Sequence, residues 1–174
     1  MRGLGRCAVT GKGLAARFAL VRRMDAAEGL KALGATVVLD VTAADFDAQF
    51  AAASRELKPR VFLDAVTDAI SERVFTMMPN RARWVSYGKL NPELFSMTQM
   101  GQLIFQSKVI EGFWLTPWMQ ANGAEMPRFA KELQTRFADG TWKTDVATYL
   151  PLRDVVSGLA AATQIKDGKI MITP

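Results

Sequence analysis

Short runs of apolar residues alternate with longer amphipathic segments between Phe18 and Leu115. The runs have the length of buried strands, and the segments between them carry apolar residues at helical spacing. We therefore expect strands at 18–21, 36–39, 61–63, 84–87 and 109–115, and helices at 26–33, 46–57 and 69–78. This alternation, with short connections, is typical of an α/β fold in which helices cover both faces of a parallel sheet.

The segments outside this alternation are of several kinds. Residues 89–102 hold Pro92 and have no clear period, which indicates a loop. The stretch from Trp118 to Ala138 repeats aromatic and leucine residues at helical spacing and predicts one long amphipathic helix. Asp25 is expected to cap helix 26–33. In the tail we expect a strand at 146–150, a helix at 155–162 and a strand at 169–172.

Two arginines directly follow the first clear apolar run. If Phe18–Val21 is a buried strand, Arg22 and Arg23 stand at the carboxyl end of a parallel sheet, where open α/β sheets bind their ligands. The planar guanidinium groups match the oxygens of a dianionic phosphate. The alternative is a solvated arginine pair that follows an apolar helix turn.

The glycine-rich opening of the chain allows two interpretations. In the first, Gly3-Leu4-Gly5 ends a phosphate-binding loop and 18–21 is the next strand. In the second, Cys7–Val9 is a short strand, Gly11-Lys12-Gly13 belongs to a glycine-rich loop, and a helix runs from Leu14 to Leu33. Asp40 would then contact the ribose of NAD at the end of the second strand.

Composition and charge exclude several classes of site. The 174 residues include one cysteine and no histidine, which excludes an intrachain disulfide, a histidine base and, in practice, a structural zinc site. The net charge of +5 is scattered, which favours anionic small molecules over nucleic acid. No apolar run approaches the roughly 20 residues of a membrane span. We expect a cytoplasmic protein without a metal, a nucleic-acid partner or a membrane.

The order of these motifs resembles the nucleotide-binding half of a medium-chain dehydrogenase/reductase. The branch that it resembles is that of the zinc-independent quinone reductases and 2-enoyl thioester reductases. The matching segments are 21–23, 28–35, 64–67, 85–88, 105–106, 111–115 and 167–170. Each motif alone is weak, and their order and spacing carry the resemblance. Asp68 stands where the family usually has glycine.

The resemblance implies NADPH as the cofactor and a role for each matched position. Arg22 and Arg23 would hold the 2′-phosphate, and Gly5 would belong to the phosphate loop. The other implied contacts are Val66 and Thr67 with the adenosine, Tyr87 and Gly88 with the nicotinamide ribose, and Phe113, Trp114 and Leu115 with the nicotinamide end. The catalytic residues stay unknown, because in the family the proton donor usually comes from an N-terminal catalytic domain.

The resemblance also implies how the chain is divided. Residues 1–142 would form a Rossmann-like doubly wound parallel sheet that lacks its first strand, or replaces it with 7–9, and that lacks the N-terminal catalytic domain. Residues 143–174 would form a strand-helix-strand tail that in the family packs towards that domain.

Three functions remain open from the sequence. The first is the NADPH-binding portion of an oxidoreductase that transfers hydride to a small-molecule substrate of the quinone or enoyl thioester type. The second is a non-catalytic nucleotide-binding or dimerisation module, with a homodimer formed through an edge strand near Val109–Leu115. The third is an NAD-preferring Rossmann domain that uses Gly11, Gly13 and Asp40.

Overall fold

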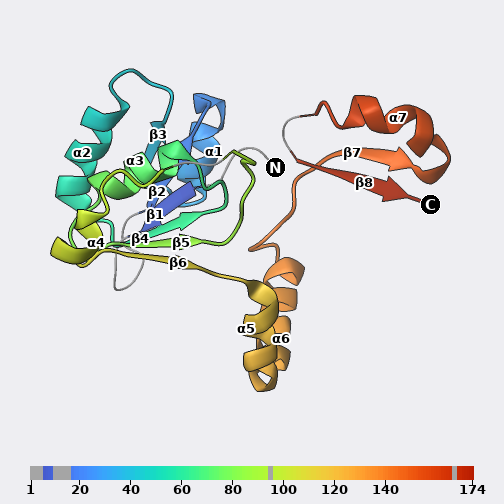
Figure 1. Ribbon diagram of the computed structural model, residues 1–174. Coiled ribbons are helices and arrows are strands. Elements are labelled where there is room, and N and C mark those ends of the chain that lie inside the picture. The colour runs from blue at the N-terminus through green and yellow to red at the C-terminus, as the bar shows by residue number, and fades with distance from the viewer. Residues whose placement is uncertain (1–5, 10–16, 94–95, 166–167) are drawn as a thin grey trace. The chain divides into compact units, whose positions relative to one another are not determined.

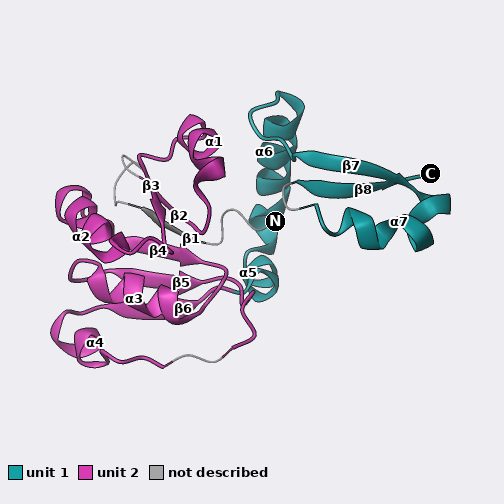
Figure 2. Ribbon diagram, turned by 90° about the horizontal axis from the view of Figure 1, so that it is seen from above, with its two compact units in different colours: residues 1–2, 114–174 teal, residues 3–113 magenta. Residues whose placement is uncertain are grey.

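The computed structural model describes residues 6–9, 17–93, 96–165 and 168–174. The chain divides into two compact units, with the boundary between Phe113 and Trp114 (Figure 2). This boundary precedes the one expected at residue 142, so the segment 114–142 groups with the C-terminal tail. The assignment of 1–142 as a domain stays a prediction, and each unit is described by itself.

The unit that ends at Phe113 is built on a sheet of six strands (Figure 1). Their order across the sheet is β3 (Val37–Asp40), β2 (Arg17–Val21), β1 (Arg6–Val9), β4 (Val61–Asp64), β5 (Arg83–Ser86) and β6 (Val109–Gly112). This is the strand order of the dinucleotide-binding fold. The expected Rossmann-like α/β class is confirmed.

The central strand of this sheet departs from the parallel direction. β1 is antiparallel to both of its neighbours: Cys7 pairs with Ala19 of β2 and with Leu63 of β4. The other strand pairs of this sheet are parallel. The central position is thus filled by the segment expected as a replacement, and its backbone groups satisfy the inner edges of β2 and β4.

Helices pack on both faces of the sheet because successive strand residues point to opposite sides. Phe18 and Leu20 of β2 lie in one core with Phe46 and Phe50 of α2 (Phe46–Leu57). α3 (Ala69–Met77) joins this core through Val74 and Phe75. The alternate residues Ala19 and Val21 pack with Leu30 of α1 (Ala27–Ala32). The expected helices on both faces are therefore present.

The termini of these helices differ in how they are capped. Asp68 caps α3: its carboxylate accepts hydrogen bonds from Ile70 N and Ser71 N. A short 3-10 helix, Met24–Ala26, precedes α1 and contains Asp25. The expectation that Asp25 caps the helix is wrong, since no side-chain cap is present there and its carboxylate pairs with Arg23 instead.

Two predicted elements after residue 100 are shorter than expected. The strand 109–115 ends at Gly112, and a helix, α5 (Leu115–Ala121), follows. The single helix 118–138 is wrong: α5 is followed by a 3-10 turn, Gly123–Glu125, and by α6 (Met126–Ala138). Pro127 explains the break, because in a continuous helix its ring would clash with the carbonyl group of residue 123. Proline is tolerated in the first turn of a helix, and Pro127 lies in the first turn of α6. A short helix that was not predicted, α4 (Gly101–Phe105), begins in the last two residues of the predicted loop 89–102.

The unit that begins at Trp114 contains two substructures. α5 and α6 touch through the rings of Trp118 and Phe129, whose centroids are 5.5 Å apart. β7 (Val146–Pro151) and β8 (Lys169–Thr173) form a parallel two-stranded sheet. A 3-10 turn, Leu152–Asp154, and α7 (Val155–Ala162) connect them. The predicted strand-helix-strand order of the tail is confirmed.

Candidate functional site

Arg22 and Arg23 directly follow the last residue of β2. Val21 is the last residue of β2 and pairs with Asp40, the last residue of β3. The side chains of Arg22 and Arg23 are 63% and 42% exposed. Because 17–21 is a strand, the prediction that it delivers two arginines to the carboxyl edge of the sheet is confirmed.

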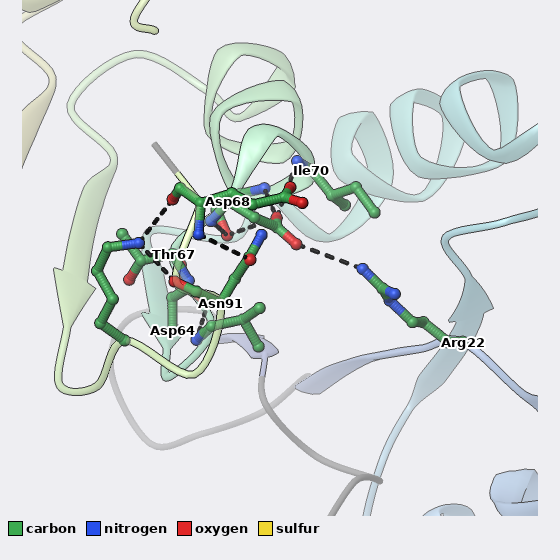
Figure 3. A network of polar contacts seen from close by, with 10 residues as sticks. Arg22, Asp64, Thr67, Asp68, Ile70 and Asn91 are labelled. Atoms are coloured by element: carbon green, nitrogen blue, oxygen red, sulfur yellow. Dashed lines mark hydrogen bonds and ion pairs between the residues drawn. The ribbon is translucent and has the colours of Figure 1, made fainter. Parts of the chain in front are cut away.

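A tight turn follows β4 at the same edge. The buried carboxylate of Asp64 accepts hydrogen bonds from Val66 N at 2.9 Å and from Thr67 N at 3.1 Å. Thr67 has a φ of 56°. This conformation is strained for a β-branched residue and persists only where the surrounding structure holds it. The Asp64 side chain therefore fixes the backbone that leads into Asp68 and α3 (Figure 3).

A second loop, after β5, runs beside this turn. Tyr87 N donates to Asp64 O at 2.9 Å and Asn91 N donates to Val66 O at 3.1 Å. The Thr67 hydroxyl donates to Gly88 O at 2.9 Å. These bonds extend the pairing of β4 and β5 beyond the sheet, so the loops 64–68 and 87–91 form one surface.

Gly88 is needed for the close approach of these two loops. A Cβ at this position would lie 3.0 Å from Ala65 O and 3.2 Å from Ala65 Cα. Real Cβ atoms rarely come this close to a backbone that cannot move aside. The missing side chain thus serves the contact with Ala65, a reason that differs from the one implied by the resemblance.

The structure brings the predicted residues together only in part. Val66, Thr67, Tyr87 and Gly88 lie in the paired loops, and Arg22 reaches them through Asp68, which its Nη2 approaches to 3.5 Å. Phe113 N donates to Ser86 O at 2.8 Å, which places Phe113 at the same edge, beyond β6. Trp114 and Leu115 begin the other compact unit as the N-cap and the first residue of α5, and both are exposed. Gly5 lies outside the described residues.

Asp68 is the residue at this edge whose role the sequence reasoning missed. Its Oδ1 holds the N-terminus of α3, and its Oδ2 faces the guanidinium of Arg22 (Figure 3). A signal existed in the sequence, because an aspartate directly before an apolar helical segment is a common N-cap.

The interpretation with a helix from Leu14 to Leu33 is wrong, since 17–21 is a strand. Gly11 and Gly13 lie outside the described residues. Val9 pairs with Arg17, the first residue of β2, and with Val61, the first residue of β4. Asp40 accepts hydrogen bonds from Thr42 Oγ1 at 2.6 Å and Thr42 N at 2.8 Å. These bonds, the hydroxyl first, hold the pKa of the Asp40 carboxyl below its ordinary value of 3.8.

The described part of the chain, 6–9, 17–93, 96–165 and 168–174, offers neither a metal-binding cluster nor a membrane-spanning helix. It contains no cluster of three or more histidine, cysteine, aspartate or glutamate residues that could hold a metal ion. None of its helices is long and apolar enough to cross a membrane.

Solved structures of reductases resemble this chain. A protein assigned as an NADPH:quinone reductase from Mesorhizobium loti is 41% identical, with a TM-score of 0.82 over 89% of this chain and 45% of its own. An enoyl thioester reductase from Candida tropicalis is 18% identical, with a TM-score of 0.70 over 90% of this chain and 46% of its own. A protein assigned as an NADPH:quinone reductase from Bacillus thuringiensis is 17% identical, with a TM-score of 0.75 over 90% of this chain and 48% of its own.

These matches confirm the resemblance to the C-terminal, nucleotide-binding portion of the medium-chain dehydrogenase/reductase superfamily. The two structures of low identity show the fold alone. The chain spans less than half the length of each of these three proteins. No protein-family model and no curated protein matches the sequence.

Proposed function

We propose that this chain is the NADPH-binding portion of an oxidoreductase that transfers hydride to a quinone or an enoyl thioester. The observation that carries the proposal is the position of Arg22 and Arg23. They follow β2 directly, at the carboxyl edge of a sheet with the dinucleotide-binding strand order. At that edge dinucleotides bind, and two exposed cations there suit a 2′-phosphate.

The remaining candidate residues would contact the other parts of the dinucleotide. Val66 and Thr67 would contact the adenosine, Tyr87 and Gly88 the nicotinamide ribose, and Phe113 the nicotinamide end. Trp114 and Leu115 would complete that end, and Gly5 would contribute to the phosphate loop. The bound cofactor would supply the hydride, while the protein binds and orients it. The substrate would be a small molecule, and zinc independence and a cytoplasmic location stay predictions.

The functions and ligands named for the related proteins support this proposal. The Mesorhizobium loti and Bacillus thuringiensis proteins are assigned as NADPH:quinone reductases. One of the related solved structures is a complex with NADP and crotonyl-CoA.

A second candidate function, a non-catalytic nucleotide-binding or dimerisation module, is favoured by the sheet edge. β6 is the terminal strand of the sheet, and its Val109 and Ile110 are 44% and 39% exposed. An open strand edge pairs readily with another strand. One related solved structure is a heterodimer of two enoyl thioester reductases.

Titration of the purified chain with NADPH and with NADH tests the first function. We expect NADPH to bind more tightly and the difference to disappear in Arg22→Ala/Arg23→Ala, because each lost charge-assisted contact costs about 1.5–3 kcal/mol. The matched control is Arg128→Ala/Arg136→Ala, which removes two arginines that pair with glutamates in the other compact unit.

The control variant should bind both nucleotides as the unchanged chain does. Equal affinities for NADPH and NADH in the unchanged chain would contradict the phosphate site. Oxidation of the bound NADPH by a quinone or an enoyl thioester would exclude the non-catalytic module.

A further inference from the structure

Asp68 places an anchored carboxylate beside Arg22. Its Oδ1 accepts from Ile70 N at 2.9 Å and from Ser71 N at 3.1 Å, and its side chain is only 6% exposed. Its Oδ2 lies 3.5 Å from Nη2 of Arg22, whose own side chain is 63% exposed. In this pair the aspartate is fixed by the start of α3, and the arginine is the partner that can move.

The ion pair between Arg22 and Asp68 joins residues that follow two strands on opposite sides of the central strand β1. Arg22 follows β2 and Asp68 follows β4, and these two strands flank β1 on either side. A phosphate bound by Arg22 would therefore approach the edge of the sheet where the Asp68 carboxylate already lies. The two anions would compete for one guanidinium group and repel each other.

We propose that Asp68 is a specificity-determining residue that weakens the binding of a 2′-phosphate and so lowers the preference for NADPH over NADH. This inference rests on the proposed nucleotide site. Asp25, which pairs with Arg23 at 3.3 Å, differs from Asp68 because its side chain is 59% exposed and can turn away. The fixed carboxylate is thus the one that a phosphate cannot displace easily.

The function of Asp68 as a cap can be separated from its charge. Asparagine and serine cap helices about as well as aspartate. Asp68→Asn therefore keeps an acceptor for Ile70 N and Ser71 N and removes the negative charge that faces Arg22. The two effects of this residue are separable by one substitution.

The experiment compares adenosine 2′,5′-bisphosphate with 5′-AMP by calorimetric titration. The first probe carries the 2′-phosphate and the second lacks it. Asp68→Asn should bind the bisphosphate roughly four- to tenfold more tightly, as expected for a repulsion across several ångströms near the surface, and bind 5′-AMP unchanged. The gain should vanish in Arg22→Ala/Asp68→Asn. The control Glu132→Gln, which frees Arg136 in the other compact unit, should change neither affinity.

The outcomes separate this inference from the proposed function. If the unchanged chain binds the bisphosphate and Asp68→Asn leaves the ratio of the two affinities as it was, Asp68 has no role in specificity. Weaker binding of both probes by Asp68→Asn would also overturn the inference, because the carboxylate would then hold the nucleotide. If neither the unchanged chain nor the variant binds either probe or NADPH, the nucleotide site itself is wrong. If circular dichroism shows that Asp68→Asn does not fold, Asp68→Ser gives the same comparison.

Discussion

Lys108 is a buried cation at the end of α3. Its residue is 3% exposed, and its Nζ donates to Phe75 O at 2.8 Å, Thr76 O at 3.0 Å and Gln102 Oε1 at 2.7 Å. A cation that donates to the last carbonyls of a helix stabilises its negative end. Burial nevertheless lowers the pKa of this ammonium from 10.5 to about 8.

This pKa predicts how stability depends on pH. Between pH 8 and 10.5 the unfolded chain holds a proton on Lys108 that the folded chain has lost, so the free energy of unfolding rises with pH in this window. We expect a rise of about 1–2 kcal/mol, since the three carbonyl contacts oppose deprotonation. Urea unfolding near pH 7.5 and pH 10 measures it.

Lys108→Met isolates this effect from the other groups that titrate in the same window. The variant keeps a long, unbranched side chain that cannot change its charge. Its stability should rise less between the two pH values than that of the unchanged chain. Identical changes in both proteins would mean that Lys108 titrates at its ordinary pKa.

Two glycines offer a matched test of the paired loops. Gly88→Ala should lower the free energy of unfolding by about 1–3 kcal/mol, because its Cβ would lie 3.0 Å from Ala65 O. Gly112→Ala is the control, since nothing lies within 4 Å of a Cβ at the end of β6, and its effect should stay within about 0.5 kcal/mol. Urea unfolding of both variants measures the difference. Equal losses would show that the two loops separate at little cost.

At the scale of elements, regular patterns were predicted well. β2, β3, β4 and β5 occupy the predicted apolar runs within about a residue at each end. α2 and α3 also match, because their apolar residues recur at helical spacing and each helix is followed by a proline, Pro59 or Pro79. Periodicity failed where it was overridden locally. The spacing continues from Trp118 to Phe137, yet Pro127 divides the helix, and this residue was visible in the sequence.

The candidate site was predictable where it follows from the ends of strands. Arg22 and Arg23 reach the carboxyl edge because an apolar run precedes them, and that placement needs no knowledge of contacts. The pairing of Asp68 with Arg22 could not be predicted, because the two residues are 46 positions apart and meet only across β1. The direction of β1 was equally hidden, since a strand of four residues has no pattern that tells parallel from antiparallel pairing.

At the scale of the whole molecule, the open edge of the sheet predicts association. Val109 N donates to Ala82 O and Phe113 N donates to Ser86 O, both towards β5. Because successive backbone groups of a strand point to opposite sides, the N–H groups of Ile110 and Gly112 point to the open edge. A second copy of the chain could pair there and extend the sheet, which is the homodimer expected from the sequence.

Ile110→Pro tests this homodimer without breaking the sheet. Proline removes an N–H that points outward and is tolerated on edge strands, so the bonds of β6 to β5 remain. Sedimentation should give a dimer for the unchanged chain and a monomer for the variant, while both bind NADPH with the same affinity. Loss of nucleotide binding together with the dimer would mean that the second copy completes the site. A dimer that survives Ile110→Pro would mean that the chains associate through another surface, and the exposed apolar residues of α7 and β8, Val156 and Ile172 among them, would be substituted next.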